Sequence, residues 1–408
     1  MEEVDCVVVG GGPGGVMLAY LLARGGARVT LLESHGDFNR RFRGDSVAPA
    51  VLDYLDTLGL AEEMLTTLPH TVVSTFGWHT SEREYTLADY RWASRRFPFY
   101  ALIPQARFLP FMTGKAAAFP GFELRMRSRA CRLLHDDDGR VQGVAYARGD
   151  GERRLRARLV VGTDGRNSKL RVLGGFRARE LGAGLDVLWH AVPKRQGDPA
   201  VSGLQLHSTA GALLAVLDQD TDWQLGYMIP AGSYRHVREA GAAPITEAFT
   251  RRLPWLADRL GTLTAVNQMT LLPVRITSVD RWYRPGLLLL GDAAHVISPV
   301  GGNGINLAIA DAAAAANLVL PHLTGAPARL DAACARVEQV RRPLTDKEQR
   351  RQHRAERSAR GRLERGLTGP PPVLRAITRI PGLPALNGRQ NSALIRIPRP
   401  CAQIMGTT

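Results

Sequence analysis

The sequence predicts an α/β fold in which a dinucleotide-binding domain with a parallel sheet carries a second, strand-rich domain. Three observations predict it. An apolar strand, a glycine-rich turn, a helix and a second strand follow one another within residues 4–33. Two later apolar strands end in turns that contain glycine and aspartate, at residues 160–165 and 287–292. The segments between these features, about 71–100 and 175–280, have the composition and alternation of strands.

The length of 408 residues is more than one hydrophobic core usually serves, so two domains are expected. We assign the dinucleotide-binding domain to residues 1–70, 101–175 and 281–345, and the strand-rich domain to residues 71–100 and 176–280. Residues 346–408 are expected to form a basic C-terminal tail, partly helical and partly extended.

The N-terminal unit carries the pattern Gly10-x-Gly12-x-x-Gly15 between the strand at 4–9 and the helix at 16–23. The first glycine permits a tight turn, the second lets the backbone approach a pyrophosphate, and the third lets helix and strand pack closely. The helix N-terminus adds N–H donors and a positive dipole. Glu33 ends the second strand, where a carboxylate accepts hydrogen bonds from ribose hydroxyls.

Hydrophobic periodicity and turn residues place the other elements. Helices are predicted at residues 51–60, 105–119, 245–260 and 305–320, the last of them rich in alanine. Strands are predicted at residues 122–127, 141–148, 153–161, 269–279 and 287–290, with further strands within 187–227.

Two more turns place a carboxylate at the end of a strand. Asp164-Gly165 follows the strand that ends at Val161, and Gly291-Asp292 follows the apolar strand 287–290. A glycine-rich loop at 298–304 then leads into the alanine-rich helix. An ionised carboxylate directly after a buried strand needs hydroxyl or N–H partners, which the sugar-like part of a cofactor supplies.

These three motifs, in this order, resemble the class A FAD-dependent monooxygenases, the para-hydroxybenzoate hydroxylase-like family. The resemblance covers about residues 1–345. It implies a Rossmann-like FAD-binding domain, an inserted β-sheet substrate domain and a C-terminal helical tail. It also implies that NADH or NADPH reduces FAD transiently. Dioxygen then adds at flavin C4a, and one oxygen atom passes to an aromatic or polycyclic small molecule, with hydroxylation as the expected outcome.

The resemblance also implies the cofactor contacts. Asp292 would bind the ribityl chain, and Asp164-Gly165 would serve the pyrophosphate side of FAD and NAD(P)H. The helix that starts near residue 305 would point its positive end at the flavin N1/C2=O edge. The complete expected set is Gly10, Gly12, Pro13, Gly14, Gly15, Glu33, Ser34, Arg43, Gln105, Ala130, Asp164, Gly165, Gly291, Asp292, Pro299, Gly301, Gly302, Asn303, Gly304, Ile305 and Asn306.

No catalytic acid or base can be assigned from the sequence. His295 follows the Gly-Asp motif and is expected to be a packing or capping histidine. The strand-rich segments hold residues that either line a substrate pocket or belong to the sheet core, namely Phe97, Phe99, Tyr100, Trp189, His190, Trp223 and Tyr227. Arg95 and Arg96 are candidates for binding an acidic substrate, although surface arginines are commoner.

The net charge is +15, and much of it lies between Arg336 and Arg365, where we expect a solvated basic helix. No nucleic-acid-binding motif is visible, so no nucleic-acid partner is expected. Four widely spaced cysteines without a CxxC pair argue against a metal site and fit a cytoplasmic protein. No uncharged apolar run has the length of a membrane span, so stable membrane insertion is not expected. A homodimer is possible.

Four alternatives stay open. A reductase of the geranylgeranyl reductase type shares the N-terminal unit, and the basic C-terminal region keeps it under consideration. A flavin-dependent halogenase is disfavoured, because the segment from Trp223 to Pro230 lacks the paired tryptophans of that group. A non-enzymatic flavin-binding protein and a nucleic-acid-binding protein are the remaining two. The substrate, the choice of NADH or NADPH, and the choice among hydroxylation, epoxidation and Baeyer–Villiger insertion stay undetermined.

Overall fold

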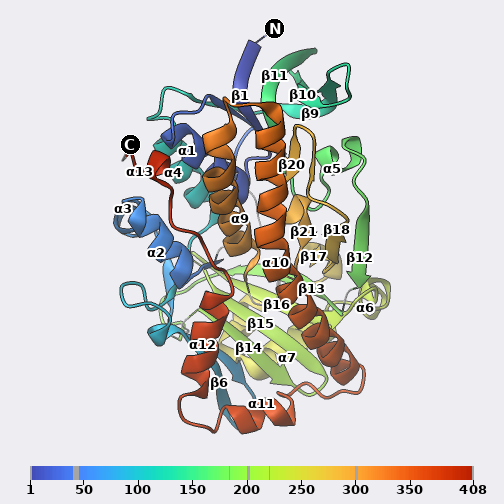
Figure 1. Cartoon of the computed structure of the whole chain (residues 1–408). Helices are drawn as coiled ribbons and strands as arrows, with labels where there is room; N and C mark the ends of the chain where they lie inside the picture. Colours follow the sequence, from blue (N-terminus) through green and yellow to red (C-terminus); the bar gives the residue numbers. More distant parts are fainter. Residues whose placement is uncertain are drawn as a thin grey trace.

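The computed structural model of the chain describes residues 2–39, 46–182, 184–199, 203–219, 221–298 and 302–406. The predicted fold class is confirmed, since two large sheets lie at opposite ends of the molecule and long helices run between them (Figure 1).

The first large sheet has eight strands, in the order β19-β20-β11-β1-β2-β8, with β10 and β9 extending from β11. Strands β20, β11, β1, β2 and β8 are mutually parallel, as expected for a dinucleotide-binding sheet. The strands of this sheet are β1 (Glu2–Val9), β2 (Val29–Leu32), β8 (Phe122–Arg125), β9 (Arg129–His135), β10 (Val141–Arg148), β11 (Gly151–Gly162), β19 (Tyr283–Arg284) and β20 (Leu287–Leu289).

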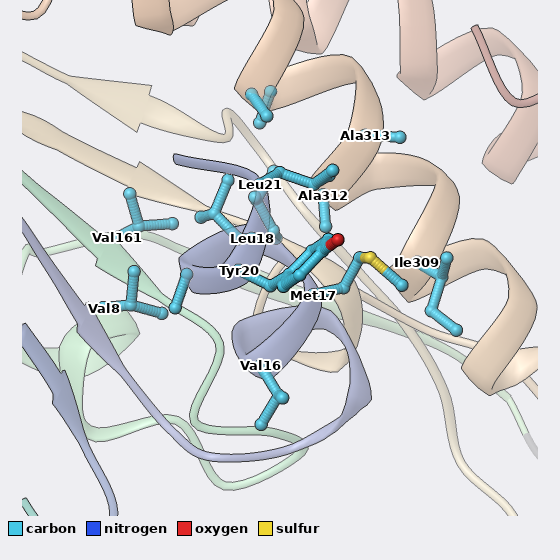
Figure 2. Packing of buried hydrophobic residues seen from close by; sticks show 14 of the residues in the cluster. Val8, Val16, Met17, Leu18, Tyr20, Leu21, Val161, Ile309, Ala312 and Ala313 are labelled. Carbon is cyan, nitrogen blue, oxygen red and sulfur yellow. The ribbon is translucent and has the colours of Figure 1, made fainter. Parts of the chain in front are cut away.

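Helix α1 (Pro13–Arg24) is buried between this sheet and helix α9 (Gly304–Val319). Figure 2 shows Met17, Leu18 and Tyr20 of α1 among residues of β1, β11 and α9. Five alanines of α9 are fully buried, and their small side chains allow the helices to approach closely; they are Ala310, Ala312, Ala313, Ala315 and Ala316. Burial of the apolar run on α9 therefore fixes α1 and the turn before it.

In the part of the chain that the structure describes, one segment, Gly304–His322, is long and apolar enough by composition to cross a membrane. It is formed by α9 and the 3₁₀ turn η5 (Leu320–His322), and 72% of its apolar window is buried inside the protein. This degree of burial is what a core helix shows.

The second large sheet has seven strands, in the order β17-β13-β16-β15-β14-β5-β6. They are β5 (Thr75–His79), β6 (Glu84–Asp89), β13 (Leu185–Pro193), β14 (Leu204–Thr209), β15 (Ala212–Asp218), β16 (Asp222–Pro230) and β17 (Thr270–Leu272). Its two faces carry separate cores. Leu214 and Leu225 pack with Phe249 on the face covered by α7 (Ala243–Arg252). Trp78 and Met228 belong to the opposite face, which meets residues of the C-terminal helices.

Two three-stranded sheets connect the large ones. One consists of β3 (Ser46–Val47), β7 (Tyr100–Leu102) and β4 (Thr71–Val73), and the other of β12 (Ala178–Gly182), β18 (Ile276–Val279) and β21 (His295–Val296). The remaining helices are α2 (Pro49–Thr57), α3 (Ala61–Thr67), α4 (Gln105–Ala116), α5 (Lys169–Leu173), α6 (Tyr234–Ala240), α7 (Ala243–Arg252), α8 (Ala257–Leu260), α10 (Pro327–Leu363), α11 (Pro372–Ile377), α12 (Leu383–Ala393) and α13 (Ala402–Met405). The 3₁₀ turns are η1 (Tyr90–Trp92), η2 (Pro254–Leu256), η3 (Val266–Gln268), η4 (Gly291–Ala293) and η5.

The element predictions fail in three places. The single strand predicted at 269–279 is wrong, because β17 ends at Leu272 and β18, which belongs to another sheet, begins at Ile276. The helix predicted at 245–260 is wrong, because α7 ends at Arg252 and Pro254 starts a separate 3₁₀ turn; proline lacks the N–H that would continue α7. Strand β9 was not predicted, since Arg129, Arg132 and His135 interrupt its apolar alternation. The expected tail boundary at residues 345–346 lies inside α10, which continues without interruption to Leu363.

Two histidines of the second sheet form a stacked pair, in which His207 is buried and His79 is half-buried. The rings of His79 on β5 and His207 on β14 stack with centroids 4.7 Å apart. Burial, then the neighbouring His79 and Arg252, lowers the pKa of His207 to about 3. Burial, together with the positive charge of Arg252, also lowers the pKa of His79, although Glu84 opposes that shift. Both rings are therefore neutral in the folded protein at neutral pH.

Acidification should consequently destabilise the protein before its carboxylates titrate. An unfolded chain protonates histidine near pH 6.5, whereas folded His207 stays neutral until about pH 3, so folding loses free energy as pH falls through this window. From pH 7.5 to pH 5, His207 alone accounts for up to ~2 kcal/mol. Thermal unfolding at both pH values should show a smaller drop in Tm for His207→Gln than for the wild type. His135→Gln, an exposed control, should match the wild type; equal drops in all three proteins would refute the role of His207.

Candidate functional site

The phosphate-binding turn has the geometry that its glycines predict. Gly10 has φ +110°, and a Cβ added there would lie 2.5 Å from the Thr163 carbonyl oxygen. A Cβ on Gly15 would lie 2.0 Å from the Gly10 carbonyl oxygen. A Cβ on Gly12 would instead meet no atom of the described residues within 4 Å, so these residues leave the space before α1 open. Gly12 is the N-cap of α1 and makes no side-chain cap, which leaves the helix N-terminus available to an anion.

Thr163 joins this turn to the Asp164 loop through hydrogen bonds. The sequence does not predict it as a site residue. Its hydroxyl lies 2.8 Å from the Gly10 carbonyl oxygen and 3.0 Å from that of Val9, to which it donates. Its backbone N–H donates to the same Val9 oxygen at 2.8 Å. No local signal could have identified it, because the hydroxyl and its partner Gly10 are 153 residues apart in the chain.

Glu33 holds the next part of the site. Its carboxylate is buried and accepts hydrogen bonds from the Gly11 N–H at 2.8 Å and the His35 N–H at 2.8 Å. The Ser34 hydroxyl lies 3.2 Å from Oε1 of Glu33. The Glu33 carbonyl accepts from the Ser128 N–H at 2.8 Å, which brings the start of β9 and its buried Ala130 beside the end of β2. The expected ribose and adenine contacts therefore lie together.

The Asp164 carboxylate organises its own loop. One oxygen accepts from the Leu170 N–H at 3.0 Å, and the other accepts from the Ser168 hydroxyl. Gly165 has φ +81°, a left-handed conformation that favours glycine. Asp164 thus stabilises the entry into α5, and the backbone around Gly165 remains the part that can face a ligand.

Asp292 lies in the Gly-Asp turn, and its side chain is 33% exposed. It accepts a hydrogen bond from Nε of Arg166 at 3.2 Å, so the two motif loops are linked by an ion pair. Arg171 adds a second link by donating to the carbonyls of Ala293 at 3.1 Å and Arg166 at 2.6 Å. Burial lowers the pKa of Arg171, although Asp164 and Asp292 oppose the shift. Neither arginine was predicted as a site residue.

A buried carboxylate on α9 fixes the position of the Gly-Asp turn. Asp311 accepts from the Gly291 N–H at 3.2 Å, from Nε of Arg341 at 2.7 Å, and lies 2.6 Å from Nε2 of His295. Burial alone would raise the pKa of Asp311, but attraction and hydrogen bonds from His295 and Arg341 hold it below its usual range. His295 also stacks on Trp282, with centroids 4.8 Å apart. This geometry fits the packing role expected for His295.

The start of α9 is fixed by Asn306, which is fully buried. Its Oδ1 accepts from the Ala48 N–H at 2.8 Å, and its Nδ2 donates to the carbonyls of Ser46 at 3.0 Å and Gly302 at 3.2 Å. The Ser46 hydroxyl also donates to the Gly302 carbonyl at 2.7 Å. Asn306 therefore uses its side chain to hold β3 against the loop, and any contact with a cofactor would come from its backbone.

A polar stripe on α10 holds the other side of the same loop. The buried carboxylate of Glu348 accepts from Nε2 of Gln352 at 2.8 Å and from Nδ2 of Asn303 at 3.4 Å. Gln352 Oε1 accepts from the Ser298 N–H at 2.8 Å. Arg351 forms two 2.8 Å hydrogen bonds to Glu348. Among the described residues, the buried Oδ1 atom of Asn303 has no hydrogen-bond partner, so an acceptor lies at the N-terminus of α9.

Some of the other predicted cofactor contacts lie in described elements, and some do not. Gln105 is buried at the first residue of α4, Pro13 and Gly14 start α1, and Gly304 and Ile305 start α9. Arg43, Pro299 and Gly301 lie outside the described residues.

The candidate pocket residues do not lie on one surface: Trp189, Trp223 and Tyr227 are on different faces of the second sheet, and Tyr100 is on β7 of a three-stranded sheet. Trp223 packs on Trp255 at 5.2 Å and belongs, with Tyr227, to the core on the α7 side. Trp189 packs on the opposite face. Tyr100 is buried against Tyr90 at 4.5 Å, beside Arg351 and Glu348. Of the candidates, Trp189 and Tyr100 thus lie on the sides that meet the C-terminal helices.

Taken together, these residues fit FAD. The open helix N-terminus with its two sterically required glycines suits a pyrophosphate, and the Glu33 carboxylate suits a ribose. The partly exposed Asp292 suits the ribityl hydroxyls, and the unpaired Asn303 acceptor stands where a flavin ring would meet α9. The Rossmann-type turn alone would serve several dinucleotides, but the second and third loops joined to it add the sites that a ribityl chain requires.

Comparison with known proteins agrees with this geometry. Residues 3–348 match the family described as "FAD binding domain". The chain is 35% identical over 318 residues to 6-methylpretetramide 4-monooxygenase of Streptomyces rimosus, covering 77% of this chain and 74% of that protein. It is 28% identical over 361 residues to protoasukamycin 4-monooxygenase of Streptomyces nodosus subsp. asukaensis, covering 85% and 86%.

The crystal structure of PqsL, a probable FAD-dependent monooxygenase from Pseudomonas aeruginosa, has the same fold, with a TM-score of 0.73 and 23% identity. The match covers 90% of this chain and 98% of that one. The extent of the family match and the identity to a named monooxygenase lead to one conclusion: the chain belongs to the FAD-binding-domain family and, within it, to the class A FAD-dependent monooxygenases.

Proposed function

We propose that the protein hydroxylates a polycyclic aromatic small molecule, using NADH or NADPH and dioxygen. In the overall reaction, one oxygen atom replaces an aromatic hydrogen as a hydroxyl group, the second oxygen atom leaves as water, and NAD(P)H with one proton supplies the two electrons. The observation that carries the proposal is the linkage of three separate loops whose residues fit FAD. The 35% identity to 6-methylpretetramide 4-monooxygenase supports oxygen transfer to a small molecule.

FAD, when bound, would supply hydride acceptance and dioxygen activation. The residues of the chain would bind the cofactor and orient it. The α1 N-terminus at Gly12 would hold the pyrophosphate, Glu33 the ribose, and Asp292 the ribityl chain. The α9 N-terminus, capped by no side chain, would place its positive dipole end where negative charge develops on reduction.

The same chain also orients and shields the reacting region. Glu348 directs the amide of Asn303 so that its NH₂ faces the carboxylate and its oxygen faces away. The second sheet, on the face that carries Trp189 and Met228, offers an apolar wall that would exclude water from the substrate.

The cofactor assignment predicts a specific loss. Asp292→Ala should weaken FAD binding by about tenfold or more, because ribityl hydroxyls would lose a charged acceptor. Fluorescence titration of the apoprotein with FAD measures the Kd, and circular dichroism checks the fold. Asp137→Ala, in an exposed turn between β9 and β10, should bind FAD like the wild type. An unchanged Kd for Asp292→Ala, with the fold intact, would contradict the assignment.

The reaction itself is tested with isotopic oxygen. Purified enzyme with FAD, NADPH or NADH and a panel of phenols and polycyclic aromatic polyketides should consume reductant faster in the presence of its substrate. Under ¹⁸O₂ the product should gain one ¹⁸O atom, measured by mass spectrometry. Reduction of an alkene under anaerobic conditions would instead indicate a reductase, and peroxide in equal amount to NAD(P)H with every compound would exclude oxygen transfer.

A further inference from the structure

The C-terminal segment forms an exposed surface made of apolar residues and arginines. Between residues 372 and 389, every exposed residue among those described is aliphatic, proline, glycine or arginine. The exposed fractions are 69% for Val373, 53% for Ile380 and 48% for Leu386, and Leu367 just before them is 50% exposed. Helices α11 and α12 carry this surface at the end of the molecule farthest from the N-terminus (Figure 1). We call it the C-terminal surface.

Its charge has one sign. Residues 365–408 contain six arginines and no aspartate, glutamate or lysine. Within the described part of the chain, Arg365, Arg375, Arg379 and Arg389 make no ion pair; Arg375 donates from Nε to the Pro370 carbonyl at 2.9 Å. Uncompensated arginines between exposed aliphatic side chains favour a partner that is both anionic and apolar.

A tryptophan extends this surface. Trp92 in η1 is 67% exposed, the largest exposed aromatic of the described chain. Helix α12 crosses η1 closely, since a Cβ on Gly388 would lie 2.0 Å from the Asp89 carbonyl oxygen. Asn387 also donates to the Leu87 carbonyl at 2.6 Å, which fixes α12 on β6. Tryptophan prefers the water–lipid boundary because its ring is apolar and its N–H is polar.

We propose that the C-terminal surface docks the enzyme on an anionic lipid bilayer. Aliphatic side chains and Trp92 would enter the boundary between headgroups and acyl chains, while the arginines would face anionic headgroups. Peripheral binding is expected, because among the described residues the one helix with the composition of a membrane span is mostly buried in the core. The inference does not depend on the reaction proposed above, although it would place the enzyme where an apolar polycyclic substrate partitions.

Other occupants fit less well. In a two-fold dimer through this surface, the arginines of one copy would face those of the other, which is unfavourable. Nucleic acid would satisfy the arginines, but its phosphate backbone gains nothing from exposed valine, isoleucine and leucine. The core of a protein interface is usually depleted of charge, whereas here arginines alternate with aliphatic residues along the segment.

The test is flotation of the full-length, FAD-saturated protein with phosphatidylcholine vesicles, with and without one quarter phosphatidylglycerol. We expect at least tenfold stronger binding to the anionic vesicles, weakened by high salt. Arg375→Gln with Arg379→Gln should weaken binding by an order of magnitude or more, and Val373→Asp should do so as well.

Val172→Asp is the matched control, because Val172 on α5 is also a valine, 68% exposed, and lies away from α11. It should bind anionic vesicles like the wild type, and circular dichroism should show both aspartate variants folded. Equal binding to both vesicle types, no binding to either, or equal loss in Val172→Asp would overturn the proposal. A change of oligomeric state by size-exclusion chromatography in Val373→Asp, without vesicle binding by the wild type, would assign the surface to self-association instead.

Discussion

The buried carboxylate of Asp311 connects the elements on which the flavin site depends. It joins the backbone of the Gly-Asp turn, His295 at the start of β21 and Arg341 on α10 through one side chain on α9. A fully buried carboxylate is unfavourable unless its oxygens are paired, and here each oxygen has a charged or N–H partner. Because the partners come from separate segments, α9 can pack against α1 only when the Gly-Asp turn and α10 are also in place.

The same arrangement makes the C-terminal helix part of the site. Arg341 holds Asp311, and further along the same face Glu348 and Gln352 hold Asn303 and Ser298. These positions recur at the spacing of a helix face, so one side of α10 is polar and buried while the other is basic and solvated. Arginines dominate the composition of residues 336–365, so the sequence predicts a solvated basic helix. The structure confirms this for one face of α10, whereas the other face is buried.

Sequence reasoning identifies candidate site residues where the signal is local. Each of these signals lies within a few residues of the turn or strand end that suggests its role; they are the glycine spacing at 10–15, Glu33 and Gly291-Asp292. It fails where a side chain acts on a partner far along the chain. Thr163 reaches Gly10 across 153 residues, Asn303 reaches Glu348 across 45, and Arg166 reaches Asp292 across 126. The break at Pro254 is a different kind of error, because its signal is local. The apolar periodicity favours one continuous helix, but the proline in the sequence ends it.

Asn303 shows how such a distant contact determines chemistry. An amide can turn either its oxygen or its nitrogen toward a neighbour, and the two faces differ in what they would offer a ligand. The Glu348 carboxylate accepts hydrogen bonds from Arg351 and Gln352, and in the same way it takes the amide nitrogen of Asn303 as a donor. The amide oxygen is therefore left as an acceptor at the α9 N-terminus. Arg351 balances the charge of Glu348, so the orientation is fixed without a net buried anion beside the site. The helix that the sequence places in a tail therefore decides which polar atom the loop presents.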